Sequence, residues 1–269
     1  MAIITISRGS YSEGKEVAER VAEKLGYKCI AREVILKASE EFNIPEIKFA
    51  RAIHDAPSFF ANFTYGREKY IAYFKSALLK QMKADNIVYH GLAGHFFIKG
   101  ISHALKVRII ADLEDRARVK MQREGISKEK AISAIKNGDE ERKKWSLQLY
   151  GIDTSDPSLY DLMIHIKKLT LDDAVDLISQ CARTKTFETR PESRAAMNDL
   201  VVAAAVKAAL VAFRPDIEVH ARDGKVILGT RVTLIKDPEV VREVETIARG
   251  IPGVETVDFK MSHLVEWGD

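Results

Sequence analysis

The segment Gly9 to Lys15 has the spacing G-x-x-x-x-G-K, in which a lysine directly follows the second glycine. It comes after the apolar run Ile3 to Ser7, which is typical of a buried strand in a parallel sheet. Residues 16–25 then carry apolar side chains every four positions and end at Gly26, a pattern typical of an amphipathic helix. A glycine-rich turn between a strand and a helix lets backbone N–H groups converge on phosphate oxygens. The start of the chain therefore predicts an α/β fold with a phosphate-binding loop at its first turn.

The candidate nucleotide-binding residues belong to this loop and to the first helical turn: Gly9, Ser10, Tyr11, Ser12, Glu13, Gly14, Lys15 and Glu16. Lys15 supplies a mobile cation to the β- and γ-phosphates of a nucleotide, which also makes it a candidate catalytic residue. The alternative is a glycine-bearing turn that joins a strand to a helix and binds nothing.

Glu16 stands where such loops usually have the Ser or Thr that holds Mg²⁺. A carboxylate is an acceptable Mg²⁺ ligand, so Glu16 is the candidate metal ligand. Without the metal, two like charges 4 Å apart would cost about 1 kcal/mol in water and about 4 kcal/mol at a protein surface. Nucleotide binding is then expected to depend on Mg²⁺. The equally weighted alternative is that Glu16 points into solvent and gains about 0.3 to 1 kcal/mol from the helix dipole.

Further short apolar runs alternate with long helical patterns, at residues 28–30, 87–89, 107–111 and 162–166. This alternation is typical of βαβ units and predicts a doubly wound parallel sheet of the P-loop NTPase type. The helix after the last run begins with Thr170 to Asp173, a sequence that resembles a capping box with Asp in place of Glu.

A polar stretch without apolar periodicity, which contains Pro191, separates two parts of the chain. The predicted organisation is a first domain over 1–183, a linker over 184–194 and a small α+β domain over 195–269. The second domain has an α-β-β-α-β pattern: a helix over 195–213, alternating strands on both sides of Asp223-Gly224, a helix from about 238 and a last strand over 254–261.

The composition of the chain indicates which classes of binding partner and which compartment to expect. The 269 residues include 42 Lys and Arg against 39 Asp and Glu, and this near cancellation supports neither a nucleic-acid partner nor a membrane surface. Cys29 and Cys181 are the two cysteines, and they lie too far apart in sequence to suggest a disulfide framework or a zinc site. Without a leader sequence or a long apolar segment, the chain is expected to be cytoplasmic.

Five parts of the amino-terminal half match a known family: Ile4–Arg8, Gly14–Glu16, Ala22–Tyr27, Arg32–Ile35 and Val107–Leu171. Through them, residues 1 to about 180 resemble the cytidylate kinase-like family of P-loop nucleoside monophosphate kinases. The resemblance implies phosphoryl transfer from ATP, with Mg²⁺, to a nucleoside monophosphate or similar small phosphate acceptor, under a mobile helical lid. It makes Arg8 and Arg32 candidate substrate-binding residues, and in this family a Glu at the position of Glu16 is common.

A basic helix face predicts the lid independently, because Arg116, Lys120 and Arg123 follow one another at spacings of four and three. Phosphoryl transfer is catalysed mainly by positioning and charge neutralisation, so Arg116 and Arg123 are candidate catalytic residues. Arg142 joins them because residues 139–142 resemble the second lid helix of the family. The alternative is an ordinary solvated basic face.

Two departures from the family affect the acceptor site. The family commonly has Gly-Arg after the third strand, where this chain has His90-Gly91-Leu92, and commonly has Asp where this chain has Ala31. Both changes remove polar groups that could bind an acceptor, so cytidine monophosphate cannot be assumed. A non-catalytic nucleotide-binding sensor is the competing hypothesis.

Other noticeable residues are better explained by packing. An aromatic-rich stretch is expected to pack in the core rather than to stack on a base: Phe59, Phe60, Phe63, Tyr65, Tyr70, Tyr73 and Phe74. The seven histidines are expected to be structural or surface residues, because their spacing completes no metal site.

Residues 195–265 resemble a BON domain through Ile217–Val219, Asp223–Thr230 and Ile251–Val254. The resemblance implies binding of a membrane or a small ligand, or assembly into a homo-oligomer, and hence a regulatory or tethering role. No basic cluster or exposed apolar helix supports membrane association. The alternative is a module that only stabilises the kinase-like half.

Overall fold

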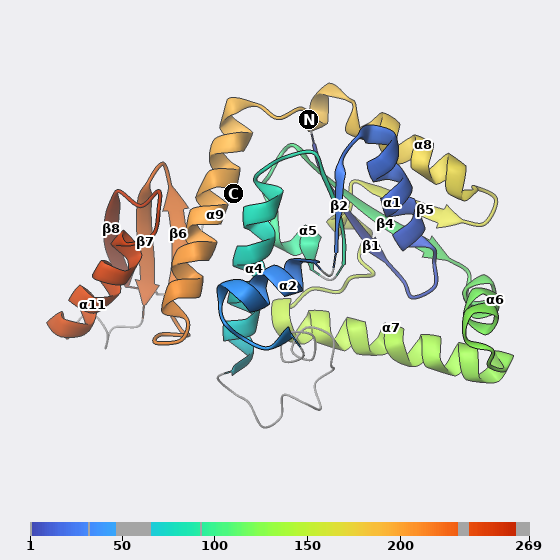
Figure 1. Ribbon diagram of the computed structural model, residues 1–269, viewed down its shortest axis with the longest axis horizontal. Helices are drawn as coiled ribbons and strands as arrows, with labels where there is room; N and C mark the ends of the chain where they lie inside the picture. The colour runs from blue at the N-terminus through green and yellow to red at the C-terminus, as the bar shows by residue number, and fades with distance from the viewer. Residues whose placement is uncertain (1, 32, 47–65, 92, 231–236, 262–269) are drawn as a thin grey trace. The chain divides into compact units, whose positions relative to one another are not determined.

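The computed structural model describes residues 2–31, 33–46, 66–91, 93–230 and 237–261 (Figure 1). These residues form two compact units. The first holds the described residues up to 34 and those from 84 to 190, and the second holds those between 35 and 83 and those from 191 onward. The predicted domain boundaries stay a prediction, because compactness does not decide which segment folds alone.

The first unit is built on a five-stranded sheet in the order β2-β3-β1-β4-β5, and its strands are parallel. The predicted parallel sheet is confirmed, while its strand order was not among the predictions. The strands are β1 (Ile3–Arg8), β2 (Lys28–Ile30), β3 (Ile87–His90), β4 (Ala104–Ala111) and β5 (Leu162–Ile166). The helices are α1 (Gly14–Leu25), α5 (Gly94–Phe97), α6 (Leu113–Glu124), α7 (Lys128–Tyr150) and α8 (Leu171–Ala182), with 3₁₀ turns η1 (Pro157–Leu159) and η2 (Lys185–Phe187). Strand β4 begins three residues before the predicted run, because its pairing with β1 continues through the charged Lys106 from Ala104.

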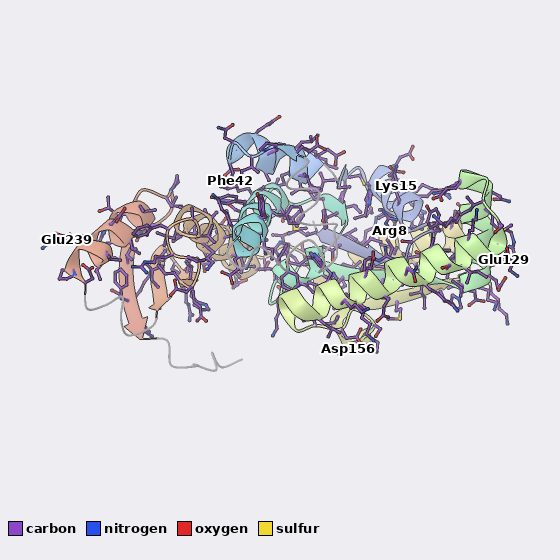
Figure 2. All side chains as sticks on the ribbon, turned by 90° about the horizontal axis from the view of Figure 1, so that it is seen from below. Arg8, Lys15, Phe42, Glu129, Asp156 and Glu239 are labelled. Carbon is purple, nitrogen blue, oxygen red and sulfur yellow. The ribbon has the colours of Figure 1, made fainter. Side chains whose placement is uncertain are left out.

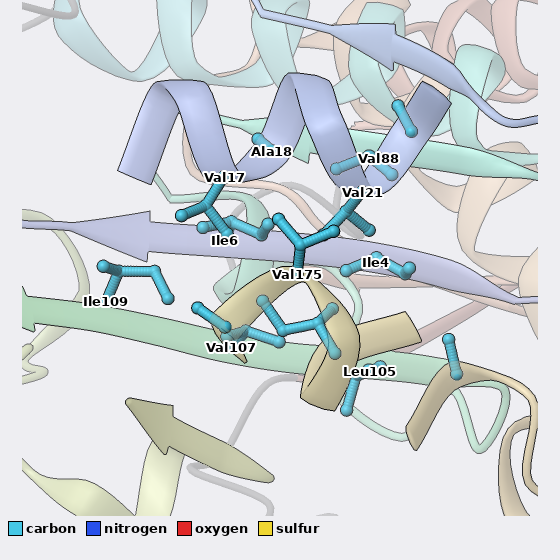
Figure 3. Close-up of a cluster of buried hydrophobic side chains, with 14 of the residues drawn as sticks. Ile4, Ile6, Val17, Ala18, Val21, Val88, Leu105, Val107, Ile109 and Val175 are labelled. Carbon is cyan, nitrogen blue, oxygen red and sulfur yellow. The ribbon is translucent and has the colours of Figure 1, made fainter. Parts of the chain in front are cut away.

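Two helices cover one face of this sheet (Figure 3). Ile4 and Ile6 on the central strand β1 pack with Val17 and Val21 of α1 and with Val175 of α8, all in one buried cluster. Helix α1 ends at Gly26, whose φ of 67° lies in the left-handed region that glycine adopts easily. The cluster fixes both segments that border the phosphate-binding loop.

The predicted start of α8 is confirmed. The Thr170 side chain accepts a hydrogen bond from the backbone N–H of Asp173, and the Asp173 carboxylate accepts one from the backbone N–H of Thr170. Two backbone groups that the helix itself leaves unpaired are satisfied in this way.

The second unit contains a three-stranded sheet in the order β6-β7-β8. Strand β6 (Glu218–Arg222) is antiparallel to β7 (Lys225–Thr230), which is parallel to β8 (Thr256–Met261). Its helices are most of α2 (Glu33–Glu41), α4 (Gly66–Met82), α9 (Pro191–Leu210) and α11 (Pro238–Arg249). A buried apolar cluster from α9, the sheet and α11 forms its core, with Leu210, Leu228 and Val244 fully buried. The predicted hairpin and α-β-β-α-β order are confirmed.

Helix α9 begins at Pro191, four residues earlier than predicted and within the predicted linker. Proline has no N–H and a fixed φ, both of which suit the first turn of a helix. Pro191 therefore starts this helix instead of interrupting the chain.

Some sequence predictions fall outside the described residues: Arg32, Leu92, the aromatic residues Phe59, Phe60, Phe63 and Tyr65, and residues 231–234 of the second hairpin strand. On α4, core packing is confirmed for Tyr73 and Phe74, which are both buried. Within the described ranges, no helix combines the length and apolar character needed to cross a membrane.

The β1 cluster makes a prediction about stability. Ile6 is 1% exposed, so Ile6→Ala leaves a cavity and is expected to lower the free energy of unfolding by about 2 to 5 kcal/mol. Leu177 on α8 is 40% exposed, and Leu177→Ala is the control, with an expected change of about 0.5 kcal/mol or less. Urea denaturation followed by circular dichroism measures both. Equal losses in the two variants would contradict this account of the core.

Candidate functional site

The loop between β1 and α1 has a constrained backbone. Tyr11 and Glu13 both have φ of 60°, in the left-handed region that side chains other than glycine rarely adopt. Glu13 is the residue before α1, and its side chain makes no capping hydrogen bond to the helix. The first N–H groups of α1 are thus left without a side-chain cap, as an anion-binding helix start requires.

Both loop glycines lie directly beneath arginine side chains. A Cβ at Gly14 would lie 2.7 Å from Arg8 Cβ, and one at Gly9 would lie 3.2 Å from Arg116 Cζ. The first approach is closer than real Cβ contacts, so Gly14 cannot be replaced without moving the loop or Arg8. Gly14 therefore leaves room for the aliphatic part of Arg8, and Gly9 leaves room for the guanidinium group of Arg116.

Ser12 holds the middle of the loop in place. It is fully buried, and its hydroxyl lies 2.9 Å from the carbonyl oxygen of Gly9 and 3.4 Å from that of Ile109 on β4. This hydroxyl donates within the protein and ties the loop to the neighbouring strand.

Lys15 and Glu16, by contrast, are exposed on the first turn of α1. The Lys15 side chain is 62% exposed and its Nζ lies 3.6 Å from Glu19 Oε1, while the Glu16 side chain is 48% exposed and its Oε1 lies 3.9 Å from Arg20 Nη1. Exposed pairs of this kind are weak, so both side chains can turn to a ligand at little cost. Arg8 and Lys15, which border the loop, are labelled in Figure 2.

Positive charge gathers around the loop. The pKa of Arg8 is lowered mainly by burial, then by the positive charge of Arg142, while Glu19 acts in the opposite direction and Arg123 lowers it further. A partly buried cation among other cations is costly unless an anion compensates it. This arrangement is typical of a site that binds anions.

The basic face of α6 contacts the loop, so the alternative of a solvated face is wrong for two of its three residues. Arg116 Nε donates to the carbonyl oxygen of Ser10 at 2.7 Å, and Lys120 Nζ donates to the Tyr11 hydroxyl at 3.1 Å. The side chains of Arg116 and Lys120 are each 11% exposed. Arg123 stays more exposed, with its Nη2 3.9 Å from Glu13 Oε1.

Helix α7 brings a further cation to the same loop. Arg142 Nη1 donates to the Ser10 hydroxyl at 2.7 Å. The Asp139 carboxylate, one turn earlier on α7, accepts hydrogen bonds from both Arg116 and Arg142. The four candidate cations Lys15, Arg116, Arg123 and Arg142 thus all border the loop.

Two carboxylates at this site were not predicted. Asp139 lies three residues before Arg142, a spacing that indicates an ion pair on one helix but says nothing about Arg116. Glu124 pairs with Lys120 and also accepts a hydrogen bond from the Tyr11 hydroxyl. Lys120 first, and Tyr11 second, lower the pKa of Glu124 through these hydrogen bonds. The contacts of Tyr11 with Lys120 and Glu124 join residues far apart in the sequence, so no local pattern predicts them.

The carboxy-terminal end of α7 is held by aromatic side chains. The ring centroid of Tyr150 lies 5.0 Å from that of Phe96, 5.7 Å from that of Phe97 and 5.6 Å from that of Trp145. Phe96 and Phe97 belong to α5, beside the sheet. Trp145 lies on α7 itself, so the two contacts with α5 are the ones that attach this end of the helix, and each is worth about 0.5 to 1.5 kcal/mol beyond its buried area.

His90, at the end of β3, is one of the residues that depart from the family pattern. It is 7% exposed, and burial, followed by the positive charge of Arg8, lowers its pKa to about 4. The imidazole is therefore neutral near pH 7. Its Nδ1 has no hydrogen-bond partner among the described residues. Arg32, the predicted acceptor-binding arginine, lies outside them.

A second polar cluster lies on strands β1 and β4. Arg108 donates to Ser7 Oγ at 3.3 Å and to the Tyr160 hydroxyl at 3.0 Å. Burial and the nearby Arg108 lower the pKa of His95 to about 3, and the His95 ring lies beside that of Tyr160. Both His90 and His95 are therefore neutral near pH 7. Their expected structural role stays a prediction.

No group of three or more His, Cys, Asp or Glu side chains that could hold a metal ion occurs among the described residues. Mg²⁺ in nucleotide sites is commonly held by one or two carboxylates together with substrate phosphates and water. An exposed carboxylate on the first turn after the loop, as Glu16 supplies, fits that requirement.

Together, the fold and this site define a P-loop kinase-like protein. Five parallel strands are ordered β2-β3-β1-β4-β5, the loop follows the central strand, and helices between β4 and β5 contact that loop. A model described as the cytidylate kinase-like family matches residues 3–168, and the chain belongs to this family.

Individual relatives agree with this assignment. The cytidylate kinase of Thermococcus kodakarensis is 36% identical over 87 residues, which cover 32% of this chain and 44% of that enzyme. The one from Pyrococcus horikoshii is 36% identical over 90 residues and is covered for 46% of its length, so both matches span less than half of the relative. The cytidylate kinase of Methanopyrus kandleri is 28% identical over 178 residues, or 65% of this chain and 90% of that enzyme.

A solved structure has the same fold over the matched region. The uncharacterized protein from Eubacterium ventriosum aligns with a TM-score of 0.54 at 21% identity, covering 67% of this chain and 97% of that one. At this level of identity the likeness concerns the fold alone.

The loop geometry predicts the effect of a single methyl group. Gly14→Ala is expected to displace the loop, because its Cβ would overlap with Arg8, and to weaken tripolyphosphate binding about tenfold or more. Gly138→Ala on α7 is the control, since the nearest atom to its Cβ is Arg142 Nη1 at 3.9 Å. Isothermal titration calorimetry with tripolyphosphate measures both. Equal affinity of Gly14→Ala and the unchanged protein would contradict the role given to this glycine.

Proposed function

We propose that this protein transfers a phosphoryl group from ATP to a nucleoside monophosphate or a similar small phosphate acceptor. The observation that carries the proposal is the convergence of Arg116 and Arg142, from two different helices, on Ser10 of the loop. Arginines that arrive from a lid are what phosphoryl transfer requires, because charge on the transferring group must be neutralised. Membership of the cytidylate kinase-like family supports the same reaction.

In this proposal the donor phosphates lie on the loop amides between Gly9 and Gly14, and Lys15 turns from Glu19 to the β- and γ-phosphates. Arg116, Arg123 and Arg142 neutralise charge on the transferring group. Arg8 and Arg32 orient the acceptor phosphate. Glu16 would contribute a carboxylate to Mg²⁺, and the ion would supply neutralisation of phosphate charge.

The acceptor is proposed only as a class. Cytidine monophosphate is the first candidate, because the relatives from Thermococcus kodakarensis and Methanopyrus kandleri are named cytidylate kinases. His90 offers a neutral imidazole near the end of β3, where the family commonly has arginine two positions later. The acceptor is thus expected to be bound by fewer charged groups than the family pattern supplies.

A sensor that binds nucleotide without turnover is the competing proposal. Glu16 favours it because the general phosphate-binding motif has Ser or Thr at this position, and Ala31 and Leu92 favour it because they remove polar groups from the acceptor site. The carboxy-terminal part, residues 195–265, is proposed to be a BON-like regulatory or tethering module in either case, supported by its α-β-β-α-β order. Light scattering and vesicle sedimentation on the intact protein separate self-association from membrane tethering.

Lys15→Ala tests the catalytic proposal. Mg-ATP is offered with a panel of nucleoside monophosphates and release of ADP is measured. Turnover on at least one acceptor is expected to exceed the background ATPase, and Lys15→Ala is expected to lower it by about 100- to 1,000-fold, since a cation on the transferred charge is lost.

Lys24→Ala is the matched control, because Lys24 lies on the same helix and pairs with Asp176 away from the loop. It is expected to keep full turnover. Tight ATP binding with no turnover on any acceptor would reject the kinase proposal and leave the sensor.

Glu16→Gln tests the metal role. If Glu16 is a Mg²⁺ ligand, the variant needs a several-fold higher Mg²⁺ concentration for half-maximal nucleotide binding. Glu23→Gln, an exposed carboxylate later on α1, is the control. An identical Mg²⁺ requirement in both variants would mean that Glu16 only interacts with the helix dipole.

A further inference from the structure

Asp139 occupies the centre of the cation cluster. Its Oδ1 and Oδ2 accept hydrogen bonds from Arg116 Nη2 at 2.9 and 2.7 Å, and Oδ1 also accepts one from Arg142. Both arginines at the same time donate to Ser10 of the loop, through Arg116 Nε and Arg142 Nη1. One carboxylate therefore closes a ring of contacts between the loop, α6 and α7.

A phosphate at the loop would accept hydrogen bonds from the same guanidinium groups that now donate to Asp139. Guanidinium groups bind phosphate and carboxylate alike, through short charge-assisted hydrogen bonds to their oxygens. The donors proposed to bind the transferring group are thus already bonded to an anion of the protein itself. Lys120 on α6 is paired in a similar way with Glu124, while Arg123 makes only a looser contact, with its Nη2 3.9 Å from Glu13 Oε1.

Charge explains why an internal anion is needed here. The Arg116 side chain is 11% exposed, and Arg8 and Arg142 lie close enough for Arg142 to lower the pKa of Arg8. Without a carboxylate among them, these guanidinium groups would repel one another in a partly desolvated place. Asp139 offsets part of this positive charge where α6 and α7 meet the loop.

We propose that Asp139 is an internal substitute for phosphate, which holds Arg116 and Arg142 on the loop in the nucleotide-free protein and is displaced when a polyphosphate enters. That this polyphosphate belongs to the phosphoryl donor rests on the proposed function. Asp139 then opposes nucleotide binding, because the incoming phosphate must replace the hydrogen bonds that Asp139 already accepts and must approach a like charge.

If Asp139 instead positions the arginines in the complex, its removal is expected to change the affinity in the opposite direction. If Asp139 stayed bonded to the arginines in the complex and only aimed them, its removal would disorder them and weaken binding. The effect of neutralising Asp139 on affinity therefore decides between the two roles.

The test compares Asp139→Asn and Asp139→Ala with the unchanged full-length chain. Calorimetry with tripolyphosphate and with Mg-ATP, without acceptor, is expected to give a dissociation constant about tenfold lower in both variants, because a competing charge-assisted contact is gone. Glu140→Gln is the control, since Glu140 is the next residue on α7, is 60% exposed and lies 3.8 Å from Lys144. It removes the same charge and is expected to leave the affinity unchanged. Equal or weaker binding in Asp139→Asn would overturn the proposal.

A second measurement concerns the resting protein. Amide hydrogen exchange of residues 9–14 without nucleotide is expected to be faster in Asp139→Asn than in Glu140→Gln, because the contacts through Ser10 loosen. Unchanged exchange would show that Asp139 does not hold the lid and would also overturn the proposal. Neither measurement needs turnover, so tighter binding without ADP release on any acceptor would refute the kinase proposal and leave the role of Asp139 intact.

Discussion

The packing of β1 between its neighbouring strands and under α1 is the interaction on which the site depends. Ile4 and Ile6 are buried against Val17 and Val21, so the two ends of the loop are held by one apolar cluster. A loop of few residues between fixed ends has little freedom, and it adopts positive φ at Tyr11 and Glu13. The free energy that this local strain costs comes from burial in the core, as is common at functional sites.

Electrostatics then determine what approaches the loop. Its glycines leave room for Arg8 and Arg116, and the cations that arrive from α6 and α7 would repel one another without the carboxylates Asp139 and Glu124. The site thus contains cations that are suited to binding phosphate, and carboxylates that form ion pairs with those cations. Apolar packing fixes the two ends of the loop, and this network of ion pairs holds α6 and α7 against it. In the proposal above, a phosphate takes the place of Asp139 in this network.

Local patterns in the sequence were sufficient for the fold and for placing the phosphate-binding loop and the cations beside it, while the roles given to these residues stay predictions. The G-x-x-x-x-G-K spacing, the apolar runs and the Asp223-Gly224 turn predict elements that the structure contains, because each depends on neighbours within a few residues. The cations Arg116, Lys120 and Arg123 were predicted from helical spacing, and Arg142 from the resemblance to the family. Asp139 bridging Arg116 and Arg142, and Tyr11 bridging Lys120 and Glu124, were not, because these contacts join residues up to 113 positions apart and periodicity says nothing about them. Pro191 was misjudged because a proline marks a linker and a helix start equally well.

The aromatic attachment of Tyr150 has a mechanical consequence. Helix α7 has 23 residues, so it forms a stiff rod about 35 Å long, with Asp139 about 16 Å from the attached end. A tilt of about 5° around Tyr150 moves Asp139 by about 1.4 Å, which is more than a hydrogen bond tolerates, and moves the far end by about 3 Å. A small rotation of α7 about Tyr150 would thus move Asp139 and Arg142 far enough to break their contacts with Arg116 and the loop. Every hydrogen bond within α7 would stay intact.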